Sequence, residues 1–231
     1  MKKLIGLGLS AAILAVLAVA TPLEANAQSA GLVSSVLNRM EQNRQSLKSL
    51  RAGISMEKYN SQLRDKEVLS GVVLYIPGAG NAFVRLEWNS PHHEILTSKN
   101  GNYMLYQPRK KIVYEGKNSH FSNRSDGDVL ALMNMSAAQL RTRFGEFQDV
   151  HEETLWGGVA TWHFKVFPKV TASYKHIEVW IDNEGMPVQT KMVEKNDDAT
   201  TIRLTNLAKN QTIPSDQFKQ NLDSSVKRVK G

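Results

Sequence analysis

Three short groups of ionisable residues have side chains that could bind a metal or transfer a proton. His92 and His93 are adjacent, residues 126–128 read Asp-Gly-Asp, and residues 151–153 read His-Glu-Glu. Imidazoles and carboxylates do both kinds of chemistry. Neighbouring residues of a strand point to opposite faces, however, so the paired histidines have poor geometry for one metal ion. We expect no metal site, because helix capping and solvation at strand ends account for the two acidic groups.

Motifs of the common catalytic sites are absent from the sequence. It has no Gly-x-Ser-x-Gly, no phosphate-binding Gly-Lys-Ser/Thr loop and no His-Glu-x-x-His stretch. It also has no cysteine, which excludes a thiol nucleophile, a disulfide and a cysteine-linked lipid anchor. A hydrolase acting on an envelope lipid would have His163 and His176 as its best candidate bases. We expect a protein that is not an enzyme and needs no cofactor.

The first residues are typical of a secretory signal peptide. Lys2 and Lys3 precede an apolar core at 4–20, and Ala25-Asn26-Ala27 matches the small-residue cleavage site. Residues 1–27 are therefore expected to be removed. The remainder, 28–231, is expected to form a single periplasmic domain.

The charge of the chain is basic, with 29 Lys and Arg against 22 Asp and Glu and a formal net charge of +7. Export argues against nucleic acid as the partner. Two small basic clusters, at 109–111 and 227–230, have two interpretations: a solvated surface, or docking to an anionic membrane or acidic partner.

Apolar spacing predicts helices in two places. Between 31 and 50 apolar residues recur at helical spacing, which predicts an amphipathic helix lying on an apolar surface. Between 126 and 143 the apolar residues show no strand alternation, which predicts one or two helices with Ser125 or Asp128 as the N-cap.

Short apolar runs separated by turn residues predict a sheet of about eleven strands. The expected strands are 51–59, 69–77, 82–91, 93–101, 102–108, 110–116, 144–152, 159–167, 174–182, 188–195 and 200–207. A barrel of about eight strands is filled by its own side chains, so a curled sheet of about eleven leaves interior room for a ligand or a plug. The two helical segments are the available plugs or lids.

The order of these signals resembles the LolA family, the periplasmic carriers of outer-membrane lipoproteins. The matching stretches cover most of residues 30–222. They are a Gly-led strand ending at Pro77, Arg85-x-x-Trp88-x-x-Pro91, an Asn100-Gly101 turn, Tyr103 to Pro108, Val179-Trp180-Ile181-Asp182, Gly185-x-Pro187, and 201–207 followed by Asn210, Ile213 and Phe218.

That resemblance implies a mainly β fold with helices (α+β), an unclosed antiparallel barrel whose concave face is covered by helices acting as a lid. It implies a carrier that shelters the acyl chains of lipoproteins. Its partners would be acylated lipoproteins, an inner-membrane ABC-type release complex and an outer-membrane acceptor, and the carrier itself is expected to be a monomer. One position departs from the family, whose better-studied members have an Arg before the Pro that ends the second strand. Here Ile76 stands before Pro77, so the lid is latched differently or stands open.

Strand alternation selects the residues expected to line the cavity. They are Ile54, Met56, Val72, Leu74, Ile76, Val84, Leu86, Trp88, Leu96, Trp162, Phe164, Val166, Ile177, Val179, Met192, Ile202 and Leu204, with Leu132, Met133 and Met135 on the lid. Charged neighbours fix the face at 84–88, and Leu86→Glu or Trp88→Glu is expected to abolish cargo binding in a folded protein. Between Val72 and Ile76 both faces are apolar, so a slip of one residue would exchange them. Sheltering half of a sixteen-carbon chain contributes ~6 kcal/mol.

Two alternatives remain open from the sequence. An ordinary filled core gives the same apolar alternation as a cavity. A periplasmic sensor on the same scaffold could bind lipid or lipoprotein and signal to a membrane-bound regulator. Such sensors usually carry a second domain, for which 28–231 leaves little room, and this favours the carrier.

Overall fold

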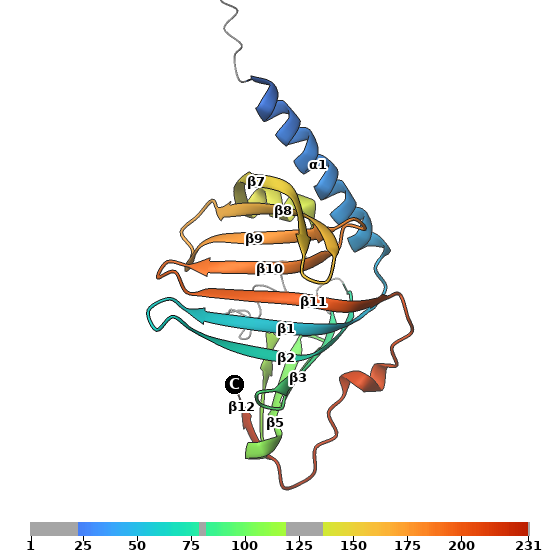
Figure 1. Cartoon of the computed structure of the whole chain (residues 1–231). Helices are drawn as coiled ribbons and strands as arrows, with labels where there is room; N and C mark the ends of the chain where they lie inside the picture. The colour runs from blue at the N-terminus through green and yellow to red at the C-terminus, as the bar shows by residue number, and fades with distance from the viewer. Residues whose placement is uncertain (1–22, 79–81, 119–135, 231) are drawn as a thin grey trace, which may run out of the picture.

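The computed structural model describes residues 23–78, 82–118 and 136–230. Twelve strands form one sheet in the order β12-β6-β5-β4-β3-β2-β1-β11-β10-β9-β8-β7. The fold is therefore mainly β, and its sheet is unclosed, with β7 and β12 as its edges (Figure 1).

The strand bounds follow the alternation of the sequence closely. They are β1 (Leu50–Asn60), β2 (Asp65–Ile76), β3 (Phe83–Ser90), β4 (Glu94–Lys99), β5 (Asn102–Gln107), β6 (Ile112–Lys117), β7 (Phe144–Leu155), β8 (Val159–Pro168), β9 (Tyr174–Asp182), β10 (Pro187–Glu194), β11 (Ala199–Lys209) and β12 (Lys227–Lys230). The first eleven are the expected strands, and every pair among them is antiparallel. Short 3-10 turns, η1 (Pro108–Lys110) and η2 (Ser215–Phe218), complete the described elements.

Strand β12 is an element that the sequence did not predict, and its exposed basic side chains fit the interpretation of this cluster as a solvated surface. Residues 227–230 pair in parallel with β6, and Arg228 forms an ion pair with Glu115. The connection from β11 passes outside the sheet, where Gln220 Nε2 donates to the backbone oxygen of Ile95 at 3.0 Å. Four residues are too few for alternation to mark a strand, so the charge was the only visible signal.

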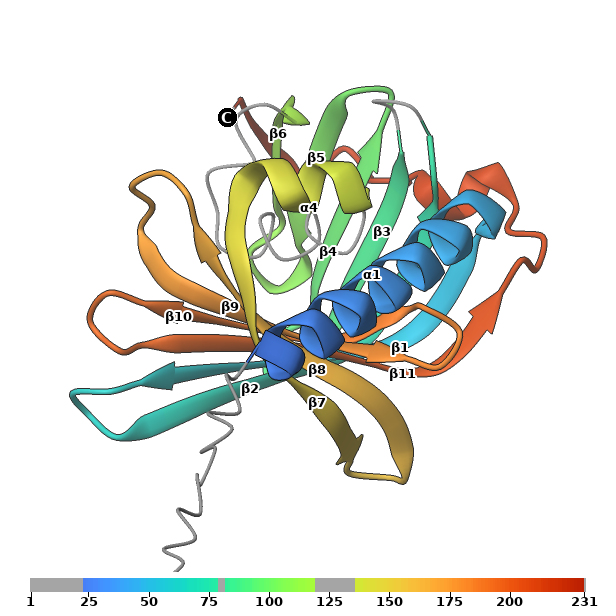
Figure 2. The same cartoon turned by 90° about the horizontal axis from the view of Figure 1, so that it is seen from above.

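In the part of the chain that the structure describes, the two helices α1 and α4 lie on one side of the curved sheet (Figure 2). Helix α1 (Leu23–Ser46) ends earlier than expected, because β1 begins at Leu50, and it contains the expected cleavage site at 25–27. Helix α4 (Ala137–Arg143) starts at Ser136, whose hydroxyl accepts from the backbone N–H of Gln139 in a capping box. The expected N-caps Ser125 and Asp128 lie outside the described residues. Within the described part of the chain, no helix is both long enough and apolar enough to cross a membrane.

Candidate functional site

The apolar concave face of the sheet is the candidate functional site. Most of the residues expected to line a cavity lie in one buried cluster on this face: Ile54, Met56, Leu86, Trp88, Leu96, Phe164, Val166, Ile177, Val179, Met192, Ile202 and Leu204. Trp162 is partly buried against the same cluster, and Val84 shares the face because it pairs with Tyr75. Side chains of directly paired residues lie on the same side of a sheet, so the pairing of neighbouring strands places all of these residues on one face.

Three expected lining residues face the other way. Strand β1 pairs Ala52 with Val73, so Val73 follows Ala52 into the core and its neighbours Val72 and Leu74 point to the outer face. Ile76 alternates with them and is also on the outer face. Both faces of β2 are apolar in the sequence, and only the register of its pairing with β1 determines which face points into the core.

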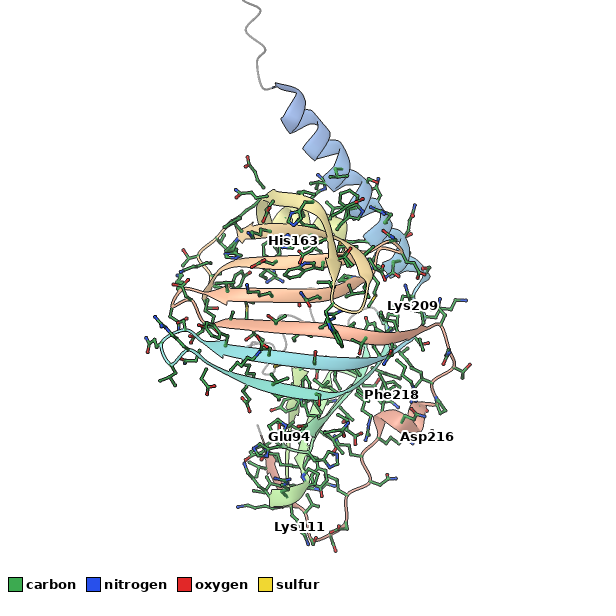
Figure 3. All side chains as sticks on the ribbon, viewed as in Figure 1. Glu94, Lys111, His163, Lys209, Asp216 and Phe218 are labelled. Carbon is green, nitrogen blue, oxygen red and sulfur yellow. The ribbon has the colours of Figure 1, made fainter. Side chains whose placement is uncertain are left out.

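The outer apolar face of β2 and β3 is partly covered by the C-terminal segment. Leu74 is buried although it lies outside the main core cluster. Next to it, the rings of Phe83 and Phe218 are 5.7 Å apart, and Phe218 belongs to the segment that runs past β3 (Figure 3). Val72 is one of the exposed apolar residues that remain on this face.

Helix α1 covers one part of the concave face. Val36, Leu37 and Met40 are buried from the helix side and belong to the same cluster as the strands β1 and β8 to β11. The burial of these side chains is what an ordinary packed core would show in this part of the sheet.

Over β2 to β6 the concave face is buried at its centre and partly exposed at its border. Val73, Leu86, Trp88 and Leu96 are buried members of the cluster. Leu69, Tyr75, Tyr103 and Leu105 are only partly buried and pack against the edge of the cluster. These four residues are not among the expected lining residues. The pairing of Leu105 with Leu96 and of Tyr103 with Ser98 places Leu105 and Tyr103 on this face. Their partly exposed side chains form the accessible apolar border of the concave face.

The expected lid residues Leu132, Met133 and Met135 lie outside the described residues. The helix that follows them, α4, contacts α1 through buried Leu140 and through its first backbone N–H. Ala137 donates that N–H to Glu41 Oε2 at 3.4 Å. Arg44 donates to the same carboxylate at 3.0 Å, and this bond lowers the pKa of Glu41 from 4.5 to about 2.

Glu41→Gln should weaken the docking of α4 on α1 in a pH-dependent way. Because the folded pKa lies below 4.5, the stabilisation by ionised Glu41 is present above pH 4.5 and is lost as the pH falls toward 2. We expect a loss of about 0.5–1 kcal/mol at pH 7, as for exposed ion pairs. Urea unfolding of both proteins at pH 7 and at pH 3 measures this, and an equal difference at the two pH values would contradict it.

The histidines proposed as hydrolytic bases lie on the outer face, away from the apolar surface. His163 Nε2 is 3.2 Å from Glu178 Oε2, and His176 Nε2 is 3.5 Å from Glu178 Oε1. The bond to His163, together with Lys191, lowers the pKa of Glu178 to about 2. The adjacent His92 and His93 have separate partners, Arg109 and Glu87. Residues 126–128 lie outside the described residues.

A shallow pocket on the outer face lies between β4, β5 and the segment after η2. Its walls include Met104 and Phe218 but also Lys99, Asn100 and Asn102. Because polar and charged side chains line much of this pocket, it is less suited to bind an acyl chain than the apolar concave face is.

A known protein family matches the chain that forms this concave apolar sheet. The family model described as "Outer membrane lipoprotein carrier protein LolA" matches residues 81–221, more than half of the chain. The chain belongs to the LolA family. No curated protein matches it.

Solved structures share the LolA-like fold at low sequence identity. An uncharacterized conserved protein from Thermus thermophilus matches with a TM-score of 0.54 and 12% identity, over 86% of this chain and 98% of that chain. A chain of the MucA/MucB complex of Pseudomonas aeruginosa matches with a TM-score of 0.50 and 14% identity, over 82% of this chain. The match covers 61% of that MucA/MucB chain, so this LolA-family chain spans about three fifths of that relative.

Proposed function

We propose that this protein is a non-catalytic carrier that shelters the acyl chains of lipoproteins on its concave face, at the partly exposed border formed by β2 to β6. It would receive them from an inner-membrane ABC-type release complex and deliver them to an outer-membrane acceptor. The observation that carries the proposal is the partly exposed apolar surface of β2 to β6 in a chain of the LolA family.

The free energy of burying an acyl chain favours reversible binding by apolar contact. Each methylene removed from water contributes about 0.8 kcal/mol, so a short length of acyl chain is held without any hydrogen bond. Leu105, Leu69 and the rings of Tyr75 and Tyr103 provide such contacts. Release to an acceptor then requires no strong polar interaction to be broken.

The geometry also supports the proposal that the protein catalyses no reaction. His163 and His176 lie on the opposite face of the sheet from the apolar surface. A cargo chain on the concave face would therefore not meet the two best candidate bases, because the sheet itself separates them.

Identification of the native cargo tests the carrier. The protein is purified from its own periplasm under mild conditions and extracted with organic solvent, and the extract is analysed by mass spectrometry. We expect intact acylated lipoprotein peptides. Recovery of free lipid would mean that the cargo is a lipid and not a lipoprotein. Recovery of cleaved lipid would contradict the proposal that the protein is not an enzyme. An empty protein that binds no apolar fluorescent probe would contradict the acyl-binding site.

The MucB match supports a second candidate, a lipid- or lipoprotein-binding sensor that signals to a membrane-bound regulator. The MucA/MucB structure is a complex of that relative with another protein. Affinity purification from membranes separates the two candidates. Recovery of a release complex favours the carrier, and recovery of a single-pass regulatory protein favours the sensor.

A further inference from the structure

Three potential metal ligands converge on the outer face of β7 and β8. They are Asp149, His151 and His163, and one ligand atom from each lies within 4.8 Å of the other two. His151 and His163 are direct cross-strand partners, and their rings are 4.8 Å apart at 66°. Figure 3 marks His163 on β8, in the part of the sheet farthest from Lys111.

His163 holds a nitrogen that lacks a hydrogen-bond partner. The residue is only 3% exposed, and its Nδ1 atom is buried and unpaired among the described residues. Its other nitrogen, Nε2, is 3.2 Å from Glu178 Oε2. An ionised carboxylate only accepts hydrogen bonds, so Nε2 donates to Glu178, and in the neutral imidazole Nδ1 then presents a lone pair. A buried acceptor left unpaired is costly unless it binds a ligand.

Asp149 orients the second histidine. His151 Nδ1 lies 3.0 Å from the backbone oxygen of Asp149 and 3.3 Å from its Oδ1. On the far side of the ring, His151 Nε2 is 3.8 Å from Glu153 Oε2, which accepts from Trp180 Nε1 at 2.8 Å. Carboxylate and backbone partners of this kind hold the imidazoles of metal sites in position.

A bulge in the edge strand creates the arrangement. The register of β7 against β8 shifts between Gln148 and His151, and Asp149 adopts a positive φ of 55°. Asp is one of the few residues that tolerate this region. Bulges redirect side chains and occur preferentially near functional sites. Here the bulge lies within the segment that carries Asp149 and His151.

The charges near the three ligands are nearly balanced. Lys165 Nζ pairs with Asp149 Oδ2 at 2.8 Å, and Lys191 Nζ pairs with Glu178 Oε1 at 3.2 Å. Because Lys165 uses Oδ2, Oδ1 of Asp149 remains directed toward His151. Glu153 adds a further carboxylate beside the site, which favours a bound cation.

We propose that Asp149 Oδ1, one nitrogen of His151 and Nδ1 of His163 bind a divalent transition-metal ion of the zinc class, with water as a fourth ligand. Imidazole and carboxylate ligands suit Zn²⁺, whose bonds to them are about 2.0–2.2 Å. The ligand atoms lie within 4.8 Å of one another, so the exposed side chains of Asp149 and His151 would rotate to reach these bond lengths. The ion fastens edge strand β7 to β8 in a chain that has no disulfide. This site is independent of the proposed acyl carrier.

Calorimetric titration of Zn²⁺ into the chelator-treated, untagged protein tests the site. We expect one ion per chain with a dissociation constant in the micromolar range or tighter, and a higher Tm in excess Zn²⁺. His151→Ala and Asp149→Asn should each weaken binding at least tenfold. Both residues are exposed, and Asn also tolerates positive φ, so neither change should unfold the protein.

His92→Ala is the matched control, because His92 is also an exposed histidine but faces Arg109. It should bind Zn²⁺ as the unmodified protein does. Absence of binding to the unmodified protein, or equal affinity in His151→Ala, would overturn the proposal.

Discussion

Leu105→Glu should lower the affinity for an acyl-chain probe by at least about 30-fold. Leu105 is a partly buried residue of the concave face, and it packs against the core cluster beside buried Leu96. Full burial of a leucine against a ligand contributes about 1.5–3 kcal/mol, and a carboxylate would also have to lose its hydration. Fluorescence titration with an apolar dye, followed by competition with an acylated peptide, measures the change.

Met104→Glu is the control for that substitution. Met104 is the neighbouring residue of β5, is also partly buried, and lies on the outer face, where it pairs with Thr97 and Glu115. We expect its probe affinity to change less than threefold. Equal losses in the two variants would place the binding surface elsewhere.

Leu86→Glu and Trp88→Glu are less informative than the sequence suggested. Leu86 is 2% exposed and Trp88 is 5% exposed in the central cluster. An unpaired carboxylate there costs more than the few kcal/mol by which a domain is stable. We therefore now expect both variants to unfold, in which case loss of binding in them would not identify a cargo site.

Gly185→Ala should destabilise the protein by more than about 3 kcal/mol and displace α1 from the sheet. Gly185 lies in the turn between β9 and β10 with a φ of +85°. A Cβ at this position would stand 2.2 Å from the backbone oxygen of Arg39 in α1. Because the obstacle is backbone, it can be relieved only by moving the helix or the turn. Urea unfolding gives the stability, and hydrogen exchange of α1 amides shows whether the helix detaches.

Gly158→Ala is the control that separates the clash with α1 from the cost of a positive φ. Gly158 has a φ of +80° in the turn between β7 and β8, but a Cβ there would meet nothing within 4 Å. The free energy of unfolding of this variant should fall by only about 1–2 kcal/mol, which is the cost of placing a residue with a Cβ in a left-handed conformation. If both variants lost the same stability, close contact with α1 would not be the cause.

Local patterns in the sequence determined the strands and one face of several of them. Alternation is a property of each segment by itself, so β1 and the strands from β2 to β11 could be placed before any tertiary structure was known. Arg85 and Glu87 fix the direction of Val84, Leu86 and Trp88, because charged side chains are costly to bury. The order of the same signals predicted the LolA family, which the family model confirms.

Tertiary structure decided every feature that depends on residues far apart in the chain. Val73 is chosen over Val72 by pairing with Ala52, and the C-terminal segment then covers part of the outer face. The burial of Val36, Leu37 and Met40 against the sheet depends on where α1 lies. His151 and His163 meet only because β7 pairs with β8 in one register. Periodicity specifies which side chains share a face, but cross-strand register and the packing of distant segments determine which of those faces are buried, open or able to bind a ligand.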